Sequence, residues 1–246
     1  MDAEEGLRRL RALGFGEADA AELWAHFDEA ERRGKRSHGH ARLPWLERLD
    51  GFDPAAEPVL VEDEAGFQRW HGNGAVGYLT LARAVGHQLA DPPGHARLVV
   101  CDRAFPTGML GHHTRRLALG GLVALLTATS PRRLGHPQGG PKLASTSPLS
   151  VAVPSSGGDP VVADVSMAAV TWGDVVAGLA SEEQLVPFGG DQAHKAFALA
   201  VALQLLVDAL VREPGHGAVL LVARPEADPV PALRRLAGGV RLPGDA

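Results

Sequence analysis

The chain has 246 residues, of which 45% are hydrophobic and 22% are charged, a composition typical of a globular protein that buries a core. Its formal net charge of −5 is spread along the chain, which indicates no basic surface for nucleic acid and favours a small-molecule or protein partner. The single cysteine, Cys101, excludes a disulfide framework or a cysteine metal site within one chain, and we expect no metal. The charged N-terminus and apolar runs shorter than the roughly 20 residues of a membrane span predict a cytoplasmic protein without membrane contact.

Apolar residues at helical spacing predict two helices within residues 3–34, and a third helix is expected from Pro44 to about Gly51. Strands and helices then alternate, which predicts an α/β fold. The predicted strands are 58–62, 67–71, 98–101, 122–129, 149–154, 160–164 and 218–223, and the predicted helices are 76–90, 108–118, 166–179, 193–211 and 229–237.

The loop between the second and third predicted helices reads Ser37-His38-Gly39-His40-Ala41-Arg42. An imidazole is a proton donor with a pKa near 6.5, and a guanidinium has the fork geometry that matches a carboxylate. A 2-oxo acid substrate requires both groups. A basic surface loop is the alternative interpretation, because the segment 32–36 in front of the loop is rich in arginine and lysine.

Residues 10–51 resemble the N-terminal region of the malate/L-lactate/sulfolactate dehydrogenase family, which also includes ureidoglycolate dehydrogenase and piperideine-2-carboxylate reductases. The matching motifs are Ala12-Leu13-Gly14, Ala20-Ala21-Glu22-Leu23, Ser37-His38-Gly39 and Arg42-Leu43-Pro44. The resemblance implies that Ser37, His38 and Arg42 bind the carboxylate and the neighbouring oxygen of a small-molecule carboxylate substrate, with His38 as the proton donor.

Further motifs follow in the order typical of this family. Pro137-Gln138-Gly139-Gly140 and Ser145-Thr146-Ser147-Pro148 resemble a turn that contacts the cofactor, which implies that Gly139, Gly140, Ser145, Thr146 and Ser147 bind NADH or NADPH. The resemblance also implies catalytic roles for Asp164 and Lys195, which would orient or polarise the substrate. A helix N-cap is the alternative role of Asp164, because aspartate is a preferred capping residue.

One departure affects the cofactor side of the site. Pro106 stands where the family pattern has a histidine beside the nicotinamide, and a proline side chain cannot transfer a proton. His112 is expected to replace that histidine at the cofactor, and a solvated surface histidine is the alternative. Alanines at 196 and 198 also replace two glycines of the family pattern, and the segments 164–187 and 211–246 are abbreviated.

The alternation of strands and helices predicts an α/β fold, and the resemblance implies a mixed sheet and an N-terminal helical region, distinct from the Rossmann fold. The expected regions are 1–55 with the substrate loop, 56–212 as the α/β cofactor-type domain, and 213–246 as a short C-terminal strand and helix. The expected function is an NAD(P)H-dependent reductase of a 2-oxo acid or a carboxylate-bearing cyclic imine, working as a homodimer in biosynthesis. The alternatives are a cofactor-independent enzyme that catalyses an addition, cyclisation or isomerisation, and a non-catalytic binding protein.

Overall fold

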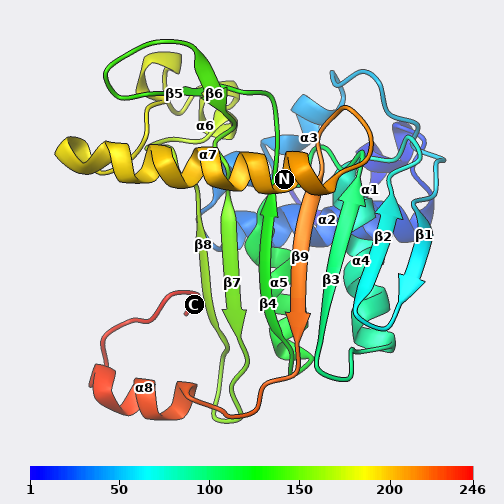
Figure 1. Ribbon diagram of the computed structural model, residues 1–246. Coiled ribbons are helices and arrows are strands. Elements are labelled where there is room, and N and C mark those ends of the chain that lie inside the picture. The colour runs from blue at the N-terminus through cyan, green and yellow to red at the C-terminus, as the bar shows by residue number, and fades with distance from the viewer. Residues whose placement is uncertain (246) are drawn as a thin grey trace.

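The computed structural model describes residues 1–245 and is built on a seven-stranded sheet in the order β1-β2-β3-β9-β4-β7-β8 (Figure 1). Strands β2 and β3 pair in parallel and the other neighbouring pairs are antiparallel. The sheet strands are β1 (Val59–Glu64), β2 (Phe67–His71), β3 (Ala96–Asp102), β4 (Val123–Ala128), β7 (Leu149–Val153), β8 (Val161–Val165) and β9 (Ala218–Ala223). This arrangement confirms the predicted mixed-sheet α/β fold, which is distinct from the all-parallel Rossmann sheet.

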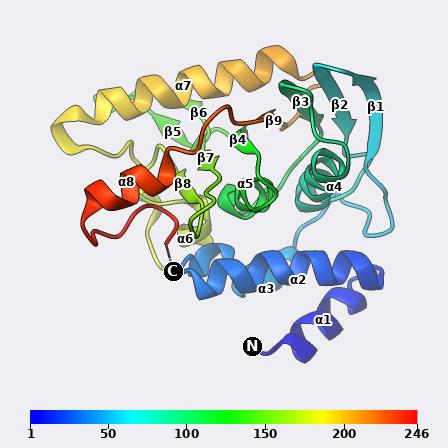
Figure 2. The same cartoon turned by 90° about the horizontal axis from the view of Figure 1, so that it is seen from below.

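Helices cover both faces of the sheet, and the N-terminal helices form a further layer (Figure 2). Helices α4 and α5 lie on one face, α7 crosses the other, and α1 to α3 pack outside α4 and α5. The helices are α1 (Ala3–Ala12), α2 (Glu17–Arg32), α3 (Arg42–Leu46), α4 (Gly77–Ala90), α5 (Leu110–Leu119), α6 (Trp172–Val176), α7 (Ala193–Leu210) and α8 (Val230–Ala237). A small hairpin of β5 (Leu134–Gly135) and β6 (Lys142–Ala144) stands beside α7.

Two apolar cores hold these layers together. The first fills the space between the sheet and helices α4 and α5, because alternate residues of β4 and β9 face these helices, including Leu126 and Leu220. The second joins α1, α2 and α3 to the start of α4, where Phe27 and Leu43 pack with Leu79. The second core fixes the loop between α2 and α3 beside the sheet.

The last part of the chain supplies a central strand, since β9 lies between β3 and β4. Residues 213–246 therefore contribute to the same sheet as residues 56–212. The region boundaries at 55 and 212 stay predictions.

Two predicted helices differ from the structure. Helix α3 spans Arg42–Leu46. It can begin before Pro44, because a proline in the first turn of a helix lacks an N–H that would have no partner within the helix anyway. The helix predicted over 166–179 is wrong for its first six residues, and α6 begins only at Trp172. Thr171 caps α6 and forms a capping box with Asp174, which fixes the start of that helix more strongly than apolar spacing does.

Among the described residues, one helix is long and apolar enough to cross a membrane by length and composition. It is the 21-residue segment Gly190–Leu210, which holds an 18-residue window with a mean hydropathy of 1.5. Core helices of globular proteins meet the same criterion. Here α7 packs on β4, β6 and β9, with Ala200, Leu203 and Val207 buried.

Candidate active site

A cavity with a volume of about 330 Å³ lies where the loop before α3, the start of α4, the turn before α5 and helix α6 meet the ends of β4 and β8. The cavity brings together five residues that the sequence proposed for the site, although they are far apart along the chain. These residues are Ser37, His38, Arg42, Thr146 and Asp164.

The loop that carries the substrate motif is anchored by Glu31 of α2. The N–H of His40 donates a hydrogen bond of 3.0 Å to Glu31 Oε2, and Gly39 leaves no room for a side chain, since a Cβ there would lie 2.2 Å from the same oxygen. The ring of His40 stacks on Trp24 with centroids 4.7 Å apart. His38, in contrast, lines the cavity, so the structure separates the roles of the two histidines of the motif.

Arg42 is the buried cation of the cavity, with 7% of its surface exposed. Its guanidinium lies over the Trp45 ring, 4.9 Å from the centroid, and its Nε has no hydrogen-bond partner. The backbone of α6 approaches closely, because a Cβ on Gly173 would lie 2.3 Å from Arg42 Nη2. A buried cation with an unpartnered donor favours an anionic ligand, because an unpaired buried charge is costly.

His38 does not have the electrostatics of a strong acid. Burial, together with the charges of Arg42 and Lys35, lowers the pKa of His38 to about 3, although Asp174 opposes the shift. The imidazole is therefore neutral at pH 7, and its Nδ1 has no partner in the structure. A neutral imidazole N–H can donate a hydrogen bond to a ligand but is a poor source of protons.

Asp164 has the opposite character. Burial raises the pKa of its carboxyl, although a hydrogen bond from the backbone N–H of Gly111 and the charge of Lys35 act against that shift. The alternative of a helix N-cap is excluded, because Asp164 lies within β8 and Thr171 is the residue that caps α6. Asp164 therefore faces the cavity as the carboxyl group most disposed to carry a proton.

The hydroxyl groups expected to bind the cofactor divide into two sets. Ser145 and Ser147 are buried and bonded within the protein: their hydroxyl oxygens lie 3.2 Å apart, and the Ser147 hydroxyl donates to the carbonyl of Ala200 in α7 at 2.9 Å. Thr146 between them lines the cavity. The cavity thus receives one of the three hydroxyls that the sequence proposed.

Gly139 and Gly140 lie in a different place. They line a second cavity, of about 730 Å³. Gly189 and Gly190 line it too, and they belong to a second turn of the same pattern, Pro187-Phe188-Gly189-Gly190. Gly139 and Gly140 have φ of 97° and 107°, a backbone conformation that favours glycine. Lys142 and His136 supply cationic or hydrogen-bonding side chains at its wall.

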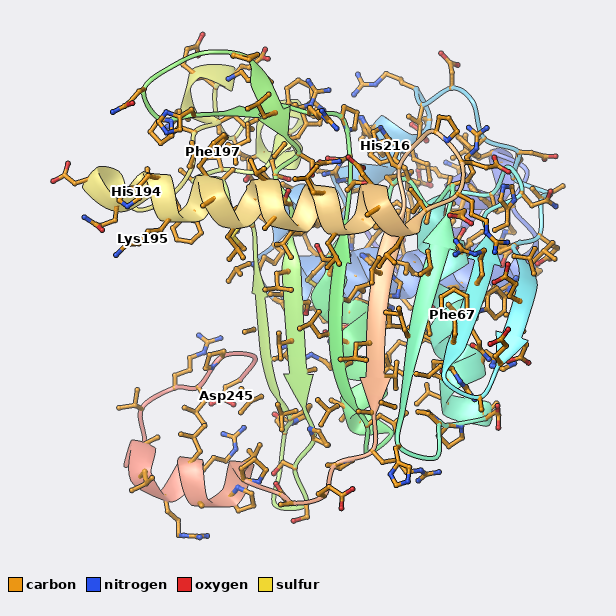
Figure 3. The ribbon with its side chains drawn as sticks, viewed as in Figure 1. Phe67, His194, Lys195, Phe197, His216 and Asp245 are labelled. Atoms are coloured by element: carbon orange, nitrogen blue, oxygen red, sulfur yellow. The ribbon has the colours of Figure 1, made fainter. Side chains whose placement is uncertain are left out.

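Lys195 and His112 lie outside both cavity linings. Lys195 is exposed near the N-terminal end of α7, beside His194 (Figure 3). His112 is buried in α5, and its Nδ1 lies 2.6 Å from Glu29 Oε2. Burial lowers the pKa of His112, but the neighbouring carboxylates of Glu22 and Glu29 outweigh this and raise it. The alternative of a solvated surface histidine is therefore wrong.

Several lining residues were not found from the sequence, namely Tyr78, Trp45, Thr129, Ser130 and Asp174. Asp174 accepts hydrogen bonds from the N–H and hydroxyl of Thr171, and a bond from Ser37 contributes to the lowered pKa of Asp174, after the opposing effect of burial. The spacing Thr171-x-x-Asp174 could have indicated the capping box. It carries no information on what α6 packs against, so only the fold brings Asp174 to the cavity.

Comparison with known proteins places these features in a family. The malate/L-lactate dehydrogenase family matches residues 6–185. The chain is 30% identical over 172 residues to (2R)-3-sulfolactate dehydrogenase (NADP(+)) of Chromohalobacter salexigens, and the alignment covers 68% of this chain and 51% of that protein. It is 28% identical over 251 residues to the Delta(1)-pyrroline-2-carboxylate/Delta(1)-piperideine-2-carboxylate reductase of Pseudomonas syringae pv. tomato, which covers 83% of this chain and 67% of that protein. The chain thus spans about half the length of the first of these relatives.

Solved structures agree with this assignment at the level of the fold. A dehydrogenase from Sinorhizobium meliloti superposes with a TM-score of 0.84 at 23% identity, covering 99% of this chain and 87% of that one. The delta1-piperideine-2-carboxylate reductase from Pseudomonas syringae superposes with a TM-score of 0.82 at 25% identity, covering 99% and 89%. With most of its length matched by the family and its sheet shared with these structures, the chain belongs to the malate/L-lactate dehydrogenase family.

Proposed function

We propose that this chain is an NAD(P)H-dependent oxidoreductase that reduces a 2-oxo acid or a carboxylate-bearing cyclic imine. One observation carries the proposal: the loop residues Ser37, His38 and Arg42 line the same cavity as Thr146 and Asp164, which come from distant parts of the chain. The relatives that are a sulfolactate dehydrogenase and a cyclic-imine carboxylate reductase support the substrate class, because each acts on a small carboxylate.

The residues present fit the reacting end of a nicotinamide cofactor. Ligand pockets usually measure roughly 300–1,000 Å³, so a cavity of about 330 Å³ suits a small substrate together with one ring. Ser130 and Thr146 supply hydroxyl groups to it, and we assign them to this ring, whereas the Thr129 hydroxyl is already bonded to the backbone of Gly217. The second cavity, with its two glycine turns and Lys142, is the candidate for the remainder of the dinucleotide. The cofactor, when bound, supplies the hydride that reduces the substrate.

The chain's own residues bind the substrate and deliver the proton. Arg42 binds the carboxylate through its guanidinium, and His38, neutral at pH 7, donates a hydrogen bond to the oxygen or nitrogen of the reacting double bond. Asp164 delivers the proton from its carboxyl group, because burial favours the protonated form at higher pH than usual. This assignment moves the acid role from His38 to Asp164 and assigns no role to Lys195, which is exposed near the end of α7.

A cofactor-independent enzyme, or a binding protein without activity, is the second candidate. The internally bonded hydroxyls of Ser145 and Ser147 favour it, because neither is free to bind phosphate or ribose. Pro106 favours it too, because its side chain offers no hydrogen bond at the cavity. Such a protein would keep the carboxylate site around Arg42 without the redox half.

We also propose a homodimer. The face of the sheet that α7 crosses bears exposed leucines, with Leu221 43% exposed on β9 and Leu205 58% exposed on α7. We place the protein in the cytoplasm, in a biosynthetic reaction, where a buried thiol such as Cys101 remains reduced.

The test combines turnover with binding. Purified protein is mixed with NADPH or NADH and a panel of 2-oxo acids and cyclic imine carboxylates, while the absorbance of the reduced nicotinamide is followed. We expect the absorbance to fall with at least one substrate and calorimetry to detect the dinucleotide. Unchanged absorbance with every substrate, together with no dinucleotide binding, would contradict the proposal and favour the second candidate.

A further inference from the structure

Tyr78 is a buried side chain of the cavity that the proposed function does not use. It is the second residue of α4, only 2% of its surface is exposed, and it belongs to the cavity lining. Its ring is held on two sides by α2, with centroids 5.4 Å from Phe27 and 4.9 Å from His26, both nearly perpendicular. The ring is therefore fixed before any ligand binds.

The turn before α5 is shaped to receive this ring. Gly108 has a φ of 69°, and a Cβ at that position would lie 2.1 Å from Tyr78 Cε1. Gly77 also packs closely on the same turn, since a Cβ there would lie 2.5 Å from the Phe105 nitrogen and 2.8 Å from the Pro106 carbonyl oxygen. Tyr78 and Pro106 both line the cavity, and the Pro106 side chain offers no hydrogen bond there.

The hydroxyl of Tyr78 has no hydrogen-bond partner within the described chain, and it is buried. An unsatisfied buried hydroxyl destabilises a fold, so its presence in a ligand cavity points to a partner that arrives with the ligand. Two other lining residues share this state, since Arg42 Nε and His38 Nδ1 are also buried and unpartnered. The three polar groups without partners therefore belong to residues that line one cavity.

The charges around Tyr78 make its hydroxyl a donor. Burial raises the pKa of the phenol, and the nearby positive charge of Arg42 opposes this without reversing it. The hydroxyl therefore keeps its proton at physiological pH. Arg42 and Tyr78 both line the cavity, so an anion that Arg42 binds there can meet the Tyr78 hydroxyl.

We propose that the Tyr78 hydroxyl donates a hydrogen bond to the substrate carboxylate that Arg42 binds, which makes Tyr78 a substrate-binding residue. This inference rests on the proposed function for the identity of the ligand. It assigns to Tyr78 the polar contact on this wall that Pro106 cannot make.

The test uses Tyr78→Phe, which removes only the hydroxyl, and a matched control. Thr80→Val is that control, because Thr80 lies on the same helix, its hydroxyl is also buried and unpartnered, and it does not belong to the cavity lining. The probe is pyrrole-2-carboxylate, a flat and unreactive ring carboxylate, and its binding is measured by calorimetry with and without NADPH. Thermal unfolding of each ligand-free protein is measured in parallel.

We expect Tyr78→Phe to bind the probe roughly 10- to 100-fold more weakly than the wild type, as for the loss of a hydrogen bond to a charged group. Thr80→Val should bind it normally. Both variants should unfold at the wild-type temperature or above, because each loses an unsatisfied hydroxyl. In turnover, Tyr78→Phe should raise KM and leave kcat within a few-fold, since the contact is made to a part of the substrate that does not react.

Equal binding by Tyr78→Phe and wild type, with binding lost in Arg42→Met, would overturn the role of Tyr78 and leave the proposed function standing. Equal loss of binding in Thr80→Val would also overturn it, because the effect would then be structural. Absence of probe binding by the wild type, together with absence of turnover, would overturn the proposed function and this inference with it.

Discussion

The two sides of the candidate site differ in how their polar groups are satisfied. On the substrate side, Arg42 Nε, His38 Nδ1 and the Tyr78 hydroxyl are buried without partners. On the cofactor side, Ser145 and Ser147 are bonded to each other and to α7. Unpartnered polar groups that line a cavity favour a ligand on the first side, whereas the hydroxyls of Ser145 and Ser147 on the second side are satisfied within the protein.

The polar groups without partners therefore lie on the side that we assign to the substrate. The loop around Arg42 keeps the chemistry of carboxylate binding in full. The cofactor side relies on Thr146, on Ser130 at the end of β4 and on the glycine turns of the second cavity.

The largest effect is expected on the substrate side, for Asp164→Asn. If Asp164 delivers the proton, kcat should fall roughly 10²- to 10⁴-fold, the contribution usual for general acid catalysis, while dinucleotide affinity stays unchanged. In the wild type, kcat/KM for reduction should fall as the pH rises through the pKa of Asp164, because the carboxyl must be protonated. Steady-state kinetics over a pH series measures both effects. A variant that keeps its rate and the same pH profile would return the proton to another donor.

The next effect is expected for Arg42→Met, which removes the buried cation but keeps the length of the side chain. Loss of one partner of a buried charged contact corresponds to roughly a 30- to 1,000-fold fall in kcat/KM. Dinucleotide binding, measured by calorimetry, should remain, because we assign the cofactor to other residues. Loss of both activities together would mean that the two sides are not separate.

The third prediction concerns the interior between α2 and α5. His112→Asn should lower the free energy of unfolding by about 2–4 kcal/mol, because it leaves Glu29 without its bond to the imidazole, although Arg33 still pairs with Glu29. Denaturant titration measures this cost. Dinucleotide affinity should not change, since His112 does not line either cavity; a tenfold weaker affinity would restore the cofactor role expected from the sequence.

A smaller effect is expected when the pH falls. The pKa of His38 is about 3 in the folded protein and near 6.5 when unfolded, and burial also lowers the pKa values of His26 and His113. Between these values the unfolded state binds the proton, so stability is complete above about pH 6.5 and is lost as the pH falls toward 3. We expect a loss of about 1–3 kcal/mol by pH 4.5, beyond the opposing contribution of His112, whose pKa is raised.

Denaturant unfolding at several pH values measures this loss, and His38→Gln should reduce the slope. Equal slopes in the variant and the wild type would show that His38 does not have a lowered pKa.

The smallest effect is expected for Lys195→Ala. Lys195 is exposed on α7 and belongs to neither cavity lining, so kcat/KM should stay within twofold and stability within about 0.5 kcal/mol. Kinetics and thermal unfolding of the purified variant check this. A tenfold loss of activity would require that Lys195 reaches a site on a second copy of the chain.

The sequence predicts the fold well where local patterns dominate. Apolar periodicity locates α2, α4 and α7, and the strand ending at Asp164 is correctly placed, because these patterns depend on which residues face a core. The motif around Arg42 identifies the substrate loop. Local patterns fail over residues 166–171, where the chain is held by contacts with the segment around Pro187 rather than by helical spacing.

The missed part of the site depends on long-range packing. Tyr78 has no motif of its own, and it reaches the cavity because α2 and the turn at Gly108 hold its ring. Lys195 follows the family pattern in sequence, yet it is exposed on α7. His112 was the expected replacement for the missing family histidine, yet it is bonded to Glu29. A sequence motif gives the type of a residue, but the hydrogen-bond partner of that residue depends on the fold.

The central claim, that hydride moves from a cofactor to a carboxylate substrate beside Asp164, can be tested by isotope transfer. NADPH with both C4 hydrogens of its nicotinamide ring replaced by deuterium is incubated with a substrate found active in the panel and with either the wild type or Asp164→Asn, and the product is examined by mass spectrometry. We predict one deuterium in the product of the wild type and at least a hundredfold less labelled product from the variant. Product formed without deuterium would contradict the account and establish cofactor-independent chemistry at this site.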